Sequence, residues 1–172
     1  QVGCVVGEGF DVLHWTYDRQ WDFTKRADRA DCAWLLVYAL KPKALHAGTP
    51  CTDMCLIGDR LMTEKTKLNN AFTMSVAEHQ RSHSLGASVE NPKTSLFWEL
   101  DPVVREFGTK ESPNKPWRFA WTDGCQLGVT YIGMTVEASK VWGQDSRMEK
   151  IYHGSPIQKS QIWVSTFDLS PM

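Results

Sequence analysis

The sequence lacks any long apolar run. No stretch approaches the roughly 20 consecutive apolar residues that a membrane-spanning helix needs, and no secretory start is visible. The chain begins with Gln1 rather than methionine, inside sequence that already reads as folded, which predicts a fragment or a processed chain. We therefore expect a soluble protein that makes no contact with a membrane.

Cysteine is scarce and odd in number. The five cysteines are Cys4, Cys32, Cys51, Cys55 and Cys125. Their spacing shows no repeat, and an odd count of this kind argues against a disulfide framework. An intracellular, reducing compartment is therefore expected, and the nucleus is one compartment that fits.

Pairs of metal ligands are also few. Cys51-x-x-x-Cys55 could form half of a zinc site, and His79-x-x-x-His83 is the only close histidine pair that could complete it, with His46 as a further donor. Structural zinc sites normally combine two tight ligand pairs. The sequence therefore predicts no metal site.

An excess of charge of one sign is missing too. Lysine and arginine number 19 and aspartate and glutamate 20, which gives a net charge of −1 and a pI near 6.6. Any contact with DNA must then come from a local basic surface. Lys110, Lys115 and Arg118 around Trp117 are the best candidate for one, although a solvated loop explains the same residues.

What the sequence does have is the composition of one compact domain. It has 172 residues, of which 42% are hydrophobic and 23% charged, close to globular averages and enough for one core. No internal repeat or low-complexity tract interrupts it. We predict a single domain over residues 1–172.

Strand and helix patterns alternate along this domain. Strands are predicted at residues 2–6, 10–15, 44–47, 86–89, 117–122 and 161–167. Helices are predicted from a Thr24 cap to Leu40, over residues 63–84, and in a short segment ending at Phe107. This alternation implies βαβ crossovers and a mainly parallel sheet with flanking helices.

Two reactive side chains follow two of these strands. Cys51 comes after Gly48-Thr49-Pro50, and Glu90 directly follows strand 86–89. Because reacting groups gather outside the carboxyl ends of strands in open α/β sheets, both are expected at one edge. A thiolate can add to an electron-poor ring carbon when an acid engages the ring nitrogen opposite. The pair therefore predicts a nucleophile and an acid, although either alone also fits a buried cysteine or a turn.

These residues also carry a family resemblance. Gly-Thr-Pro-Cys at 48–51, followed by Glu-Asn-Pro at 90–92, resembles the Pro-Cys and Glu-Asn-Val motifs of DNA cytosine carbon-5 methyltransferases. The continuation through Ser95 and Trp98 resembles a divergent branch of such domains in viral or mobile-element proteins. Proline in place of valine is a departure from the main pattern.

The resemblance implies a Rossmann-like fold that uses S-adenosylmethionine, with DNA as the partner. Cys51 would add to cytosine carbon 6, Glu90 would hydrogen-bond ring nitrogen 3, and Asn91 would brace the Glu90 loop. The base would have to leave the duplex, because neither group can reach it inside the stack. The positions expected to contact the cofactor are Asp22, Gly48 and Pro50.

Two elements of the family are missing or displaced. The glycine-rich cofactor loop has only Gly3, Gly7 and Gly9 as candidates, and too little chain separates them from Cys51. The fold is therefore expected to be truncated at its N-terminus, with Asp22 either at the acidic position that contacts the adenine end or capping a helix. The family's Arg-x-Arg element has only weak counterparts, at residues 152–159 and 124–128.

Two other functions stay open. The first is a catalytically silent module for binding or structure in a larger polyprotein, which the missing glycine loop favours. The second is an unrelated α/β enzyme for acyl or phosphoryl transfer, with Cys51 as nucleophile and His46 as its base. That enzyme would need His46 to point toward Cys51, and the sequence offers no convincing oxyanion or phosphate loop.

Overall fold

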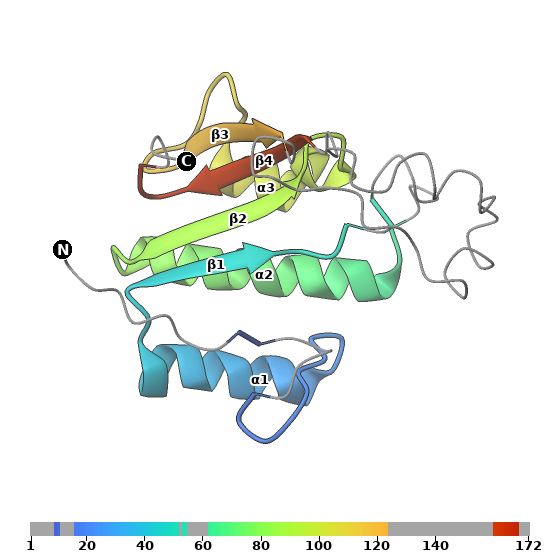
Figure 1. The fold of residues 1–172 in the computed structure, drawn as a ribbon, viewed down its shortest axis with the longest axis vertical. Helices are drawn as coiled ribbons and strands as arrows, with labels where there is room; N and C mark the ends of the chain where they lie inside the picture. Colours follow the sequence, from blue (N-terminus) through green and yellow to red (C-terminus); the bar gives the residue numbers. More distant parts are fainter. Residues whose placement is uncertain (1–8, 11–15, 52, 55–61, 124–159, 169–172) are drawn as a thin grey trace, which may run out of the picture.

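The computed structural model describes residues 9–10, 16–51, 53–54, 62–123 and 160–168 (Figure 1). The helices are α1 (Arg26–Trp34), the π-helix η1 (Leu35–Leu40), α2 (Glu64–Ser82), the 3₁₀ helix η2 (Leu96–Glu99) and α3 (Asp101–Phe107). The strands are β1 (Ala44–Gly48), β2 (Gly86–Pro92), β3 (Arg118–Asp123) and β4 (Ser160–Ser165). These elements confirm the predicted α/β class, and the strands predicted at 2–6 and 10–15 fall almost wholly outside the described residues.

The four strands form one mixed sheet in the order β1-β2-β4-β3. β1 and β2 are parallel, whereas β4 runs antiparallel to both β2 and β3. Three strands therefore share one direction and β4 opposes them, so the sheet is mixed where a mainly parallel one was expected. A parallel pair needs a crossover connection, and α2, which lies behind β1 and β2 in Figure 1, supplies it.

One hydrophobic core joins the sheet to α2 and α3. Alternate residues of a strand point to opposite faces, and Ala87 and Val89 of β2 point into this core with 1% of their surface exposed. They meet Met74 and Ala77 of α2, Val103 and Phe107 of α3, and Ile162 and Val164 of β4. The intervening residues, among them Ser88, Glu90 and Trp163, therefore belong to the other face of the sheet.

The start of α1 differs from the prediction. The expected cap was Thr24, but the N-cap residue is Lys25, and it makes no side-chain hydrogen bond. Instead, the backbone N–H and the hydroxyl of Thr24 both donate to the Asp22 carboxylate and close a turn just before the helix. α1 continues into η1, which ends at Leu40. Its C-cap residue, Lys41, has a φ of 45° and is followed by Pro42, which cannot continue a helix.

α2 begins where the sequence predicts. Thr63 is its N-cap, and the Thr63 hydroxyl accepts a hydrogen bond from the Thr66 N–H at 3.2 Å. The helix ends at Ser82, and Ser84 takes a positive φ of 56° in the turn that leads to β2. No helix in the described part of the chain combines the length and apolar character needed to cross a bilayer.

Candidate active site

The carboxyl ends of β1 and β2 form one edge of the sheet, the rim (residues 48–51 and 90–92). In the parallel register Gly48 is the partner of Glu90. A Cβ atom on Gly48 would lie 3.6 Å from the Glu90 Oε2 atom, so the Glu90 carboxyl group leans toward the end of β1. Cys51 follows Gly48 by three residues. The fold thus brings the predicted nucleophile and the predicted acid to the same edge.

Asn91 connects the two sides of the rim. Its side chain is fully buried, and its Nδ2 atom donates to the backbone oxygen of Thr49 at 3.2 Å and also to the Thr49 hydroxyl. Thr49 is 7% exposed. The family resemblance implied that Asn91 would brace the Glu90 loop; in the structure its amide binds the segment that leads into Cys51. Since a buried amide left unpaired is costly, this link fixes the two strand ends against each other.

Cys51 lies in a turn that is anchored on its far side as well. Its backbone oxygen accepts a hydrogen bond from the Met54 N–H at 2.9 Å. Met54 is fully buried, its backbone oxygen accepts from the Leu96 N–H at 2.9 Å, and its sulfur contacts Asn70 Nδ2 at 3.2 Å. The Cys51 thiol itself is free and partly exposed. A thiol at such a position is held from both sides and can still reach a substrate.

The side chain of His46 contacts residues of β2 and β4. Its Nδ1 atom lies 3.0 Å from the Ser88 hydroxyl, and its ring stacks on Trp163 with centroids 5.1 Å apart. Trp163 is in turn the β4 partner of Glu90 and donates its Nε1 proton to the Thr122 hydroxyl at 3.0 Å. Burial lowers the pKa of His46 from its usual 6.5. The structure therefore gives no support to a Cys51–His46 pair.

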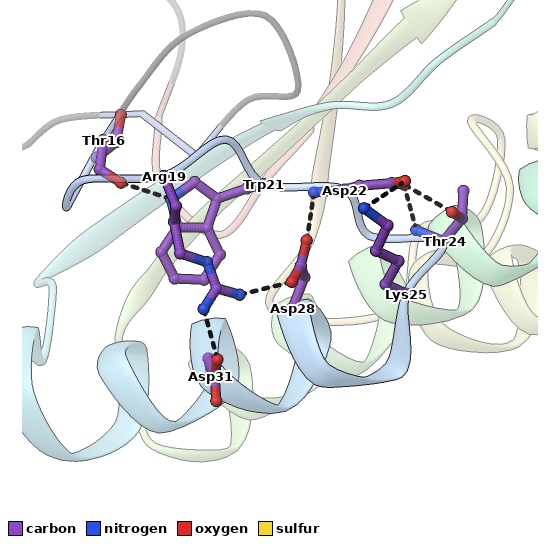
Figure 2. A network of polar contacts seen from close by, with 8 residues as sticks. All are labelled: Thr16, Arg19, Trp21, Asp22, Thr24, Lys25, Asp28 and Asp31. Carbon is purple, nitrogen blue, oxygen red and sulfur yellow. Dashed lines mark hydrogen bonds and ion pairs between the residues drawn. The ribbon is translucent and has the colours of Figure 1, made fainter.

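Asp22 belongs to a separate network of eight residues around the start of α1, the α1 network (Figure 2). Its members are Thr16, Arg19, Trp21, Asp22, Thr24, Lys25, Asp28 and Asp31. The Asp22 carboxylate accepts from the Thr24 N–H at 3.0 Å and from the Thr24 hydroxyl at 2.6 Å, and these bonds lower its pKa. Lys25 is the N-cap of α1, so Asp22 does not cap that helix; its carboxylate closes the turn just before it.

The three predicted cofactor positions lie at one end of the molecule. Gly48 and Pro50 are both exposed at the rim. α1 begins at the end of the fold where β1 and β2 finish (Figure 1), and the Asp22 side chain in front of it keeps 32% of its surface exposed. These surfaces are compatible with a ligand at the carboxyl ends of the strands, which is where α/β sheets bind them.

The proposed basic surface near β3 lacks its aromatic residue. Trp117 is 2% exposed, packs edge-to-face on Phe107 and donates its Nε1 proton to Glu106 at 3.1 Å, so it cannot stack on a base. Arg118 lies 3.6 Å from Asp168 in an exposed ion pair. This surface therefore offers exposed basic side chains, but Trp117 is not available beside them.

Metal ligands do not gather in the described part of the structure, where no group of three or more histidine, cysteine or acidic side chains could hold an ion. His79 and His83 are stacked in the last turn of α2, where the Nδ1 atom of His83 lies 2.8 Å from the backbone oxygen of His79. Cys55 lies outside the described residues, as do both candidates for the Arg-x-Arg element, at 124–128 and 152–159.

Sequence reasoning missed three contributors to this site. Thr49 binds Asn91, Trp163 stands beside Glu90, and Asp53 binds two threonines at the start of α2. Trp163 alternates with buried Ile162 and Val164, a pattern that could have assigned it to the face of Glu90. The partners of Asp53 lie 10 and 13 residues away, spacings that match no local motif.

No family model matches the chain, and no curated protein and no solved structure shows significant similarity to it. The likeness to cytosine methyltransferases consequently rests on the motifs at residues 48–51 and 90–92 and on the geometry of the rim.

Proposed function

We propose that this chain is a DNA cytosine carbon-5 methyltransferase-like domain with a Rossmann-like fold. The observation that carries the proposal is the parallel register that pairs Gly48 with Glu90, because it puts the Pro-Cys and Glu-Asn-Pro motifs on adjacent strand ends. The buried bond from Asn91 to Thr49 supports it, since it links the two motifs directly.

The chemistry assigns one role to each group. The Cys51 sulfur would form a bond to cytosine carbon 6 while Glu90 delivers a proton to ring nitrogen 3. Electron density would then build up at carbon 5, the position to be methylated. S-adenosylmethionine, when bound, would supply the methyl group there and leave as S-adenosylhomocysteine. Loss of the carbon 5 proton to solvent, return of the nitrogen 3 proton to Glu90 and release of the sulfur as thiolate would restore the ring.

A Cβ atom on Gly48 would make an ordinary van der Waals contact with the Glu90 Oε2 atom at 3.6 Å, so the Glu90 carboxyl group lies beside the end of β1. The base would have to be flipped out of the duplex to enter this site. Asp22, Gly48 and Pro50 would hold the cofactor.

A catalytically silent module is the second candidate, and Asp22 favours it. The Asp22 carboxylate already accepts two hydrogen bonds from Thr24, which leaves less of it for a ligand. Calorimetric titration with S-adenosylmethionine separates the two candidates: binding supports the enzyme, and its absence from this chain and from any longer natural form supports the module.

Covalent trapping by a duplex that contains 5-fluorocytosine, with S-adenosylmethionine present, tests the nucleophile. The wild-type chain should form a protein–DNA adduct that survives denaturation, Cys51→Ser should form none, and Cys55→Ser should still form it. Glu90→Gln should slow trapping by roughly 10²-fold or more, the usual contribution of a general acid. Trapping that persists in Cys51→Ser would overturn the assignment of the nucleophile.

A further inference from the structure

Asp53 links the Cys51 turn to the start of α2. Its Oδ2 atom accepts a hydrogen bond from the Thr63 hydroxyl at 2.7 Å and another from the Thr66 hydroxyl. The two hydroxyls also lie 3.0 Å from each other. One carboxylate oxygen thus accepts hydrogen bonds from both threonines at the start of α2, which lie 10 and 13 residues farther along the chain.

These contacts belong to the ionised form of Asp53. The hydrogen bonds from Thr66 and Thr63 lower the pKa of Asp53 below its usual 3.8. The partial positive charge at the start of α2 also stabilises the ionised carboxylate. Hydrogen bonds to a charged acceptor are shorter and stronger than neutral ones. The link is therefore present throughout the neutral pH range.

Asp53 is the third residue of the turn that carries the thiol. The bond from the Met54 N–H to the Cys51 oxygen closes residues 51–54. Asn91 holds Thr49 before the turn, and the buried Met54 holds its end. Asp53 provides the only link from within the turn to α2, among the contacts of the described residues, that uses a charged side chain.

We propose that Asp53 is a positioning residue that sets the direction of the Cys51 thiol relative to Glu90. The Asp53 carboxylate ties the turn to α2. Without this tie, the contacts of the described residues leave the bonds of Thr49 and Met54 to hold the turn. The consequence for methyl transfer rests on the proposed function. The consequence for the reactivity of the thiol does not.

The helix itself does not depend on Asp53. The Thr63 hydroxyl still accepts from the Thr66 N–H when Asp53 is replaced, so α2 keeps its N-cap. Asp53→Ala removes both bonds to Oδ2, whereas Asp53→Asn keeps an oxygen acceptor without the charge. Thr66→Val removes one bond from the helix side. Glu64→Gln is the matched control, because Glu64 is an exposed carboxylate at the same end of α2 and forms an exposed ion pair with Lys67.

Two rates decide the proposal. The first is the rate at which iodoacetamide alkylates Cys51, measured by mass spectrometry of the peptide that contains it. We expect this rate to rise about threefold or more in Asp53→Ala, because release of the turn exposes the thiol. The second is adduct formation with 5-fluorocytosine DNA, which we expect to fall roughly tenfold to a hundredfold in the same variant, because the thiol is misdirected. Asp53→Asn and Thr66→Val should lie between, and Glu64→Gln should match the wild type.

Each outcome has a separate meaning. Opposite changes in the two rates, with urea unfolding nearly unchanged, support the positioning role. Equal alkylation in Asp53→Ala and the wild type overturns it, as does an identical rise in Asp53→Asn, because the effect would then be that of charge alone. If Asp53→Ala does not fold, Thr66→Val decides by the same two criteria. If the wild type forms no adduct, the proposed function fails and alkylation still decides the role of Asp53.

Discussion

The rim and the α1 network lie at the same end of the molecule but are built differently. At the rim, the fully buried Asn91 reaches Thr49 across 42 residues of chain. In the α1 network, Arg19 binds Asp28 and Asp31, which are only 9 and 12 residues away (Figure 2). The exposed fractions of these three side chains range from 13% to 54%. The rim joins two strands, whereas the α1 network shapes the start of one helix. A buried, long-range contact is the kind that can hold two reactive groups in register.

One free cysteine, Cys51, lies at the rim, and another, Cys32, lies in α1. The largest difference that we expect is in the reactivity of these two thiols. Cys32 in α1 is 2% exposed, and burial raises its pKa to about 12. At about pH 8 its thiolate fraction is then roughly one in 10⁴ (12 − 8 = 4 decades). The partly exposed Cys51 should therefore be alkylated by iodoacetamide while Cys32 stays unmodified.

Peptide mass spectrometry measures both sites in one sample. In about 6 M urea, where burial is lost, the two cysteines should react at similar rates, which provides the control. Similar labelling of the folded protein would show that the α1 region opens easily and would remove the contrast with the rim.

Asn91→Ala should cost the most stability of any polar substitution at the rim. It leaves the Thr49 backbone oxygen buried without its donor, and such a loss typically costs about 1–3 kcal/mol. Asn114→Ala is the matched control, because the Asn114 amide likewise donates two hydrogen bonds, both to backbone oxygens, but on an exposed surface; it should cost about 1 kcal/mol or less. Urea unfolding of both variants measures the difference. Equal costs would mean that the Asn91 link does not hold the rim.

Arg19→Ala should have a smaller effect that depends on salt. The Arg19 guanidinium stacks 4.1 Å from the Trp21 ring centroid and forms ion pairs with Asp28 and Asp31 on a partly exposed surface. Contacts of this type contribute about 0.5–1 kcal/mol each or less. The loss in thermal midpoint should shrink when the salt concentration is raised from about 0.05 M to about 1 M, since screening already weakens the pairs in the wild type. A loss independent of salt would assign the effect to packing on Trp21.

Local patterns predicted the parts of the fold that local physics determines. The apolar periodicity predicted a helix over residues 63–84, which matches α2 to within two residues at each end, and the apolar run before Glu90 predicted β2. The shared edge of Cys51 and Glu90 followed from the parallel crossover alone. That part of the candidate site could be inferred because βαβ units bring successive strand ends together.

Long-range pairing could not be predicted in this way. The insertion of β4 between β2 and β3 depends on contacts between segments about 70 residues apart for β2 and about 40 for β3, and no local pattern specifies them. The burial of Trp117 depends on Phe107 and Glu106 of α3, so a basic loop with an exposed aromatic was the wrong interpretation. His46 was ambiguous for a simpler reason: a shift of one residue along β1 would have turned it to the other face.

The smallest expected effect concerns His46 and pH. Burial against Trp163 lowers its pKa from 6.5, so the folded protein favours the neutral ring. The neighbouring side chains of Ser88 and Trp163 carry no charge that would offset this. The associated stability is fully present above about pH 6.5 and is lost as the pH falls through the lowered pKa, because the unfolded chain then binds the proton first.

Between about pH 7.5 and about pH 5 the thermal midpoint should therefore fall slightly more for the wild type than for His46→Gln. An identical fall in both proteins would show that the Trp163 stack leaves the His46 ring open to water.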